Sequence, residues 1–255
     1  MKTTPARSVG VQSYCFRHFK DIAEVCKLVR GIGVYSVELC GVHADFADPE
    51  KFKATAALCA QSGIRIVSIG VQTFTGDAPR ERKWFECAQI AGAKLISAHF
   101  TPSTFQSAVP MVAKWCDEFG IRVGIHNHGG YNFGGSPDVL ETLLKLGGKN
   151  IGITLDTAWC LQIGPYAGDP VKWIKEKFPG RIHGVHYKDF IFDRRAQWSD
   201  VIIGAGNLDL PAVVAALEST GFDGPALIEY EADPENPSPA LTQCVQKIRA
   251  LNSNH

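Results

Sequence analysis

Short apolar stretches rich in β-branched residues alternate along the chain with longer stretches in which apolar residues recur every three or four positions. The short stretches predict buried β-strands, and the longer ones predict amphipathic helices. The predicted strands cover residues 8–14, 34–39, 64–70, 94–99, 121–126, 151–156, 181–186 and 225–230. The predicted helices cover residues 20–31, 49–62, 80–91, 107–119, 137–147, 169–178, 208–220 and 237–251.

This alternation of strands and helices predicts an α/β protein in which helices cover a parallel sheet. Eight such units in 255 residues favour a closed (β/α)8 TIM barrel over an open, doubly wound sheet. Strand order separates the two folds and is not visible in a sequence, so the open sheet stays as the alternative. No linker interrupts the pattern, and we expect a single domain over residues 1–255. The interval 189–208 is longer than a usual βα loop, and we expect it to be a lid rather than a plain surface excursion.

Composition and charge limit the partners and the cellular location that we expect for the protein. The chain has 26 Lys and Arg against 26 Asp and Glu, so its net charge is zero, and we expect neither nucleic acid nor a membrane surface as partner. No apolar run is long enough to span a bilayer, and the first residues do not form a secretory signal. The eight cysteines are scattered without a CxxC motif. Reduced, buried thiols and a cytoplasmic location are therefore expected.

Ionisable and aromatic residues gather where the predicted strands end. In a TIM barrel these C-terminal ends form the catalytic face. Because side chains alternate across a strand, Asp156, His186 and Glu229 are predicted to point into the barrel together with His126 or His128. Buried charges need a partner or a metal, and a set of imidazoles and carboxylates suits one divalent ion such as Mn, Zn, Co, Ni or Fe.

Each candidate also has a purely structural reading. A single strand-end His or Glu is usually a satisfied core residue, but three separate strand ends favour a metal site. The choice between His126 and His128 as the further ligand stays open. The remaining candidates are assigned to substrate: Glu38, His99 and Trp159 as binding residues, and Lys188 and Arg194 as groups that neutralise substrate charge.

Seven stretches in order along the chain resemble the xylose isomerase-like TIM barrel family, the sugar phosphate isomerase/epimerase group. They are VQSYCFR, VYSVELCG, VGIHNHGG, ITLDTAWC, HGVHYKDF, IIGAGNLDL and ALIEYE. The resemblance implies a divalent metal held by a Glu, an Asp, a His and a Glu after the last four barrel strands. The last three carry over to Asp156, His186 and Glu229. Where many members have Glu-Asn-His, this chain has His126-Asn127-His128.

The resemblance implies a metal-dependent isomerase or epimerase that removes a proton next to the carbonyl of a sugar or sugar phosphate. Glu229, His126 or His128 is then the base, with Lys188 assisting. The His-x-His motif resembles a subgroup with inosose dehydratases, and it raises the alternative of a lyase or dehydratase of a keto-inositol or 3-keto-sugar. A metal-free sugar-binding barrel is a further alternative. An apurinic endonuclease is disfavoured by the absence of an Asp-x-His pair and of basic charge, and a Rossmann oxidoreductase by the absence of GxGxxG. We expect a small carbohydrate as partner, and a homo-oligomer is compatible with the family.

Overall fold

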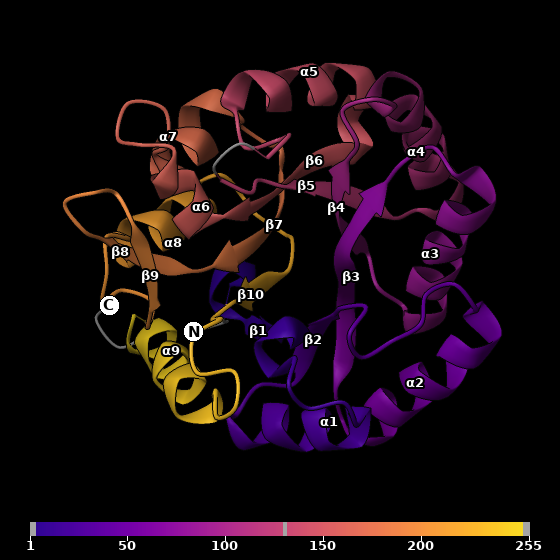
Figure 1. Ribbon diagram of the computed structural model, residues 1–255, viewed down its shortest axis with the longest axis horizontal. Coiled ribbons are helices and arrows are strands. Elements are labelled where there is room, and N and C mark those ends of the chain that lie inside the picture. Colours follow the sequence, from indigo (N-terminus) through magenta and orange to yellow (C-terminus); the bar gives the residue numbers. More distant parts are fainter. Residues whose placement is uncertain (1–3, 130–131, 252–255) are drawn as a thin grey trace.

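The predicted strands close into a parallel barrel with helices around it. The computed structural model describes residues 4–129 and 132–251. Its barrel strands lie in the closed order β1-β10-β7-β6-β5-β4-β3-β2, and Figure 1 shows them as a ring inside the helices. They are β1 (Val9–Gln12), β2 (Ser36–Leu39), β3 (Arg65–Phe74), β4 (Leu95–Phe100), β5 (Arg122–His126), β6 (Ile151–Asp156), β7 (Ile182–Tyr187) and β10 (Ala226–Ile228). The TIM barrel is confirmed, and the open sheet is excluded.

The α-helices follow the strands in turn and cover the outside of the barrel. They are α1 (Ile22–Gly31), α2 (Pro49–Gln61), α3 (Ala78–Ala91), α4 (Phe105–Phe119), α5 (Pro137–Gly147), α6 (Thr157–Gln162), α7 (Pro170–Lys172), α8 (Leu210–Ser219) and α9 (Ser238–Ala250). Short 3-10 segments lie at Pro5–Arg7, Ser13–Phe16 and Gly148–Asn150. Among the described residues, no helix is long and apolar enough to cross a membrane.

Helix boundaries follow local chemistry. Asp48 and Asp169 each precede a helix that begins with proline, and each side chain accepts two backbone N–H groups of that helix. These hydrogen bonds satisfy donors that have no intrahelical partner. Gly92 and Gly120 end α3 and α4 in the left-handed conformation, with φ of 72° and 64°, where a side chain would be strained.

Two segments differ from the sequence prediction. The predicted helix 169–178 is a single turn, α7, that continues as a π-helix over Trp173–Lys177. The short helix α6 was not predicted. It begins directly at the end of β6, because the Asp156 carboxylate caps it by accepting the N–H of Trp159.

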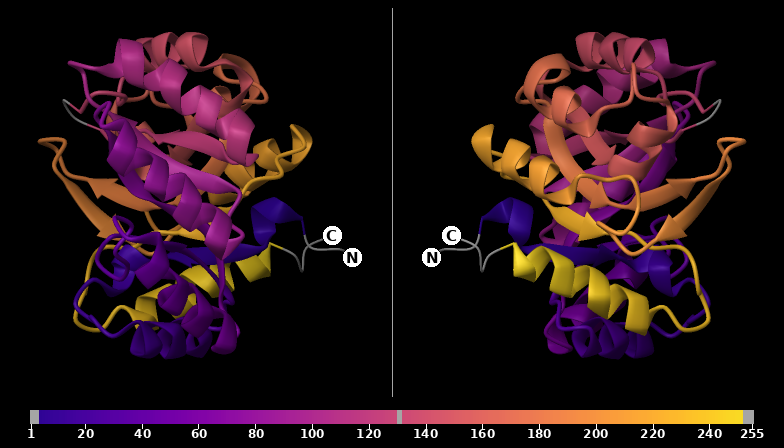
Figure 2. Two further views of the ribbon diagram at one scale, coloured as in Figure 1. Left: turned by 90° about the vertical axis from the view of Figure 1, so that its right-hand side faces the viewer. Right: turned by 90° about the vertical axis from the view of Figure 1, so that its left-hand side faces the viewer.

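The long interval after β7 contains a two-stranded hairpin. Strands β8 (Asp189–Phe192) and β9 (Trp198–Val201) pair antiparallel, and Figure 2 shows them extending outward from the barrel to their turn. Asp189, the first residue of β8, has a structural role here. Its carboxylate accepts the N–H groups of Gly204, Gly206 and Leu208 and holds the segment that returns to α8.

The barrel interior changes character along its axis. Outward-facing strand residues such as Ile96, Val123 and Ile153 are buried against the helices. Inside the barrel, small residues allow the strands to approach one another. The hydroxyl oxygens of Ser97 and Thr154 lie 3.0 Å apart there. A polar layer therefore fills the barrel centre directly beneath the ionisable strand ends.

Candidate metal centre and pocket

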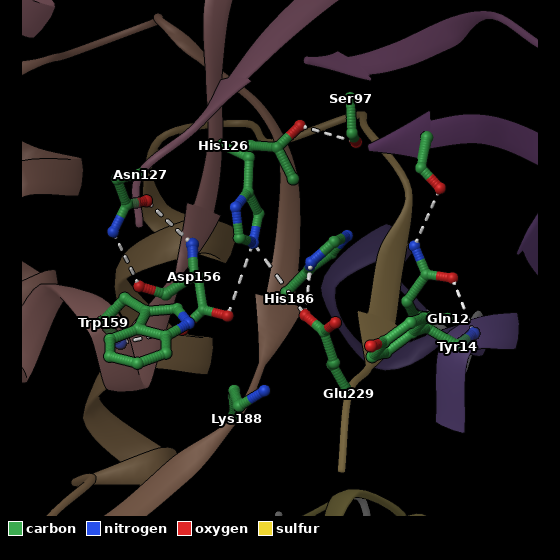
Figure 3. Close-up of polar contacts among 12 residues, drawn as sticks. Gln12, Tyr14, Ser97, His126, Asn127, Asp156, Trp159, His186, Lys188 and Glu229 are labelled. Carbon is green, nitrogen blue, oxygen red and sulfur yellow. Dashed lines mark hydrogen bonds and ion pairs between the residues drawn. The ribbon is translucent and has the colours of Figure 1, made fainter. Parts of the chain in front are cut away.

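Four ionisable side chains from four strand ends converge on one point. His126 ends β5, Asp156 ends β6, His186 lies on β7 and Glu229 follows β10. All four are buried, and one ligand atom from each lies within 4.8 Å of the others. Figure 3 shows the four side chains pointing toward one another. The structure thus brings together the residues predicted as metal ligands, and it places His126 in the cluster rather than His128.

The cluster contains polar atoms that the protein itself does not satisfy. His126 Nε2 and Asp156 Oδ2 are buried without a hydrogen-bond partner, although they lie 3.6 Å apart. His126 Nε2 also lies 3.9 Å from Glu229 Oε2. An unsatisfied buried polar group is costly, whereas two imidazole nitrogens and two carboxylates are a suitable donor set for a divalent transition metal. These residues therefore fit a metal ion.

Hydrogen bonds behind the cluster fix the direction of its ligands. The Asn127 amide donates to the Asp156 carbonyl at 3.0 Å and accepts the Asp156 N–H at 2.9 Å. Asp156 Oδ1 accepts the Trp159 N–H at 2.8 Å, which leaves Oδ2 facing the cluster. His99 Nε2 lies 3.2 Å from His126 Nδ1. If His126 Nδ1 carries the proton and donates to His99, Nε2 keeps a free lone pair for a metal.

The charge states of three of the four side chains also suit a cation. Burial lowers the pKa of His126 to about 3, with a further contribution from His186, so this imidazole is neutral at pH 7. Burial raises the pKa of Asp156 to about 6, although Lys188 opposes the shift. Burial likewise opposes the charge on Glu229, but Lys188 and His186 outweigh it and hold the pKa of Glu229 well below its usual range.

His186 is held between two carboxylates. Burial disfavours its charge, but Glu38 and Glu229 together raise the pKa of His186 well above its usual value. Its Nε2 lies 3.0 Å from Glu38 Oε1, at ion-pair distance but outside hydrogen-bond geometry. Glu38 itself accepts hydrogen bonds from Gln12, Ser68 and Ser97 at 2.6, 2.5 and 2.5 Å.

A pocket of about 420 Å³ opens above the cluster. Its lining joins two of the clustered residues to groups from several loops: Gln12, Tyr14, Cys40, Gly41, Val42, Val71, His99, His126, His128, Trp159, Glu229 and Glu231. His128 stacks on the Trp159 indole, with ring centroids 4.1 Å apart and planes 29° apart. A larger cavity of about 780 Å³ lies at the other end of the barrel, against Ile64, Arg65 and Lys94, and contains none of the predicted site residues.

The other predicted site residues differ in their relation to this pocket. His99, His128 and Trp159 line it. Glu38 does not reach it, because this side chain is fully buried in the polar layer below. Arg194 is exposed in the turn between β8 and β9 and is also absent from the lining. Lys188 is buried beside Glu231 and Asp200.

Sequence reasoning did not assign several residues of the pocket. Glu231 was recognisable only as a second inward-facing carboxylate on the last strand. Asp200 lies outside the pocket lining, where it contacts Lys188 and the Glu231 N–H, and it gave no signal, since it lies in the interval whose hairpin was not predicted. Tyr14 and Cys40 follow the ends of strands β1 and β2, and the rule that functional groups follow barrel strands is the only signal that indicates them.

Comparisons with known proteins identify the fold and the family of the chain. The chain is 28% identical over 136 residues to the rhizopine catabolism protein MocC of Rhizobium meliloti, a match that spans 48% of this chain and 40% of that protein. Among solved structures, the 3-keto-D-glucoside 4-epimerase YcjR of E. coli superposes with a TM-score of 0.71 at 15% identity, covering 95% of this chain and 99% of that one.

A second solved structure is the "probable 3-DHS dehydratase AsbF" of Bacillus anthracis. It superposes with a TM-score of 0.71 at 16% identity, covering 97% of this chain and 99% of that one. At these identities the structural matches show the fold. The sequence itself matches the profile named xylose isomerase-like TIM barrel over residues 26–252, so the chain belongs to the xylose isomerase-like TIM barrel family.

Proposed function

We propose that this protein is a divalent-metal-dependent isomerase or epimerase of a small sugar, which acts by removing a proton next to a carbonyl group. The observation that carries the proposal is the position of the metal-ligand cluster: its four ligand atoms lie within 4.8 Å of one another, and His126 and Glu229 also line the pocket. A substrate in that pocket therefore meets the cluster directly.

His126, Asp156, His186 and Glu229 would hold the ion. When bound, a divalent ion supplies Lewis-acid polarisation of a carbonyl and stabilises the negative charge that develops beside it. The identity of the ion, among Mn, Zn, Co, Ni and Fe, is part of what the experiment below measures.

Glu229 is the residue we assign as proton acceptor. Its low pKa keeps it ionised at neutral pH. Its Oε2 accepts from His186 at 2.9 Å, whereas its Oε1 accepts no hydrogen bond from any residue that the structure describes. Since the side chain lines the pocket, this oxygen is available to a C–H group of a bound sugar.

His128 is the residue we assign as proton donor. Its Nδ1 lies 3.0 Å from the Asn132 amide nitrogen. An amide N–H donates, so Nδ1 is an acceptor and the ring carries a proton on Nε2. The Trp159 indole holds the ring in place by stacking. His99, whose pKa burial lowers to about 3, lines the same wall as a neutral group.

A lyase or dehydratase acting on a keto-inositol or 3-keto-sugar is the second candidate. The observation that favours it is the presence of His126 where many family members have a carboxylate, which leaves one carboxylate fewer for moving a proton between adjacent carbons. The imidazole of His128 can instead protonate a departing β-hydroxyl group after the same first proton abstraction. The similarity to a protein described as a dehydratase is consistent with this candidate.

The test combines metal content with proton exchange. The metal content of protein purified without added metal is measured by elemental analysis. The bound metal is then removed, the protein is reloaded with each ion in turn, and it is incubated in D2O with aldoses, ketoses and keto-sugars. We expect deuterium next to the carbonyl only with metal. Formation of an epimer or isomer supports the first candidate, and an unsaturated product supports the second. Failure to bind any ion would contradict both and leave a sugar-binding barrel.

A further inference from the structure

We infer that the pocket takes an uncharged, unphosphorylated sugar, and that Glu231 is the residue that sets this preference. The inference rests on the proposed function, because it concerns the substrate class of the same site. The family resemblance leaves open whether the substrate is a free sugar or a sugar phosphate, and this inference favours the free sugar.

The charges on the pocket wall are the first observation. Among the described residues that line the pocket, none is a lysine or arginine. The charged side chains there are the carboxylates Glu229 and Glu231. Glu229 belongs to the metal cluster, so Glu231 is the charge that the distal part of a substrate would meet. Phosphate esters are bound by Arg and Lys groups or by helix N-termini, and a carboxylate in that place repels them.

The nearest cations are already engaged. The Lys188 side chain is 1% exposed, and its ammonium group contacts Glu231 Oε1, with Asp200 Oδ2 at 3.7 Å. The Arg17 guanidinium donates to the Glu231 carbonyl at 2.6 Å and lies 5.0 Å from the centre of the Tyr14 ring. Neither cation lines the pocket, and moving Lys188 toward a phosphate would leave two carboxylates without their partner.

The loops after the seventh and eighth barrel strands are the usual phosphate-binding position of TIM barrels. Here the loop after β7 carries Asp200, and the segment after β10 carries Glu231, Asp233 and Glu235. Arg194 and Arg195 lie in the exposed turn of the hairpin and do not line the pocket. The acidic residues on these two segments, with Glu231 on the pocket wall itself, make this position unfavourable for a dianion.

Glu231 is also fixed in place. Its backbone N–H donates to Asp200 Oδ2 at 2.8 Å, and its side chain is paired with Lys188 and 35% exposed. The side chain therefore presents charge to the pocket without freedom to swing away from a phosphate. The same carboxylate can accept hydrogen bonds from sugar hydroxyl groups, while the Tyr14 ring on the pocket wall, which is 37% exposed, suits the C–H face of a sugar ring.

The experiment measures binding rather than turnover. Calorimetric titrations of the metal-loaded protein compare D-fructose, D-glucose and D-xylulose, each with its terminal phosphate ester, and inorganic phosphate alone. For the wild type we expect at least one free sugar to bind about tenfold or more tightly than its ester. In Glu231→Gln, which keeps an acceptor for Lys188, we expect the ratio to fall by about tenfold, since the repulsion is removed.

The matched control is Glu235→Gln, which removes the same charge from an exposed position on the same segment and should leave the ratio unchanged. Circular dichroism checks that both variants fold. The inference is overturned if an ester binds wild type as tightly as its free sugar, if no free sugar binds, or if Glu231→Gln keeps the full discrimination. Free-sugar preference without proton exchange would refute only the proposed function. Exchange with esters alone would refute only this inference.

Discussion

His186 Nδ1 lies 2.9 Å from Glu229 Oε2, so two of the proposed metal ligands are hydrogen-bonded to each other. The second nitrogen of the same ring lies 3.0 Å from Glu38 Oε1. A protonated His186 between these carboxylates balances part of the negative charge of the cluster, and it must release its proton to bind an ion.

The role of Asp156 can be separated from its helix cap. Asp156→Asn removes the carboxylate charge next to the unsatisfied His126 Nε2, and we expect elemental analysis to find little retained metal. Asp169→Asn is the matched control, because Asp169 also caps a helix, α7, away from the pocket. Each variant should lose at most about 1 kcal/mol of stability from the weakened cap. Metal loss in both variants would show that general destabilisation is the cause.

His126 and His128 are expected to behave differently although they lie two residues apart. His126→Ala removes a group of the cluster and should weaken metal binding by at least about tenfold. His128→Ala removes the ring stacked on Trp159 and should change metal affinity by less than about threefold while it lowers turnover. Competition with a metal-sensitive dye measures both affinities. The reverse order would identify His128 as the ligand and refute our assignment.

Stability should depend on pH through Asp200. Burial raises the pKa of Asp200 to about 7 from its ordinary 3.8, although Lys188 opposes the shift. The folded state therefore binds this proton more tightly than the unfolded chain. Its stabilising contribution is complete below the unfolded pKa and is lost as the pH rises through about 7.

This loss should be absent in Asp200→Asn, whose side chain does not titrate. Urea unfolding between about pH 4 and about pH 8 should show the free energy of unfolding of the wild type decreasing relative to that of Asp200→Asn. Glu235→Gln, altered at an exposed carboxylate, should follow the wild type. Parallel curves for the wild type and Asp200→Asn would count against this account.

Close strand packing inside the barrel makes Gly124 intolerant of a side chain. A Cβ atom there would lie 2.9 Å from the Thr154 backbone nitrogen and would also contact Thr154 Oγ1. We expect Gly124→Ala to lower the free energy of unfolding by about 1–3 kcal/mol. Gly31→Ala, at the last residue of α1 where nothing lies within 4 Å, should be neutral or stabilising by up to about 1 kcal/mol. Thermal or urea unfolding compares the two, and equal effects would contradict the packing argument.

The sequence by itself determined the architecture and the metal-ligand candidates. Strand and helix periods differ, so the alternation predicted the (β/α)8 barrel, and alternating side-chain directions placed Asp156, His186 and Glu229 inside it. These features depend on local geometry that repeats along the chain. The family resemblance added the expectation of a metal and a sugar, which rests on short motifs rather than on periodicity.

Only the tertiary structure decided how these residues are arranged. The choice of His126 over His128 depends on where β5 ends relative to β6 and β10. The fully buried position of Glu38, the pairing of Lys188 with Glu231, and the contact of Asp200 with both arise from segments far apart in sequence. Such contacts depend on barrel closure and on the β8–β9 hairpin. The local pattern of hydrophobic and polar residues specifies neither the order of the strands nor the distances between side chains.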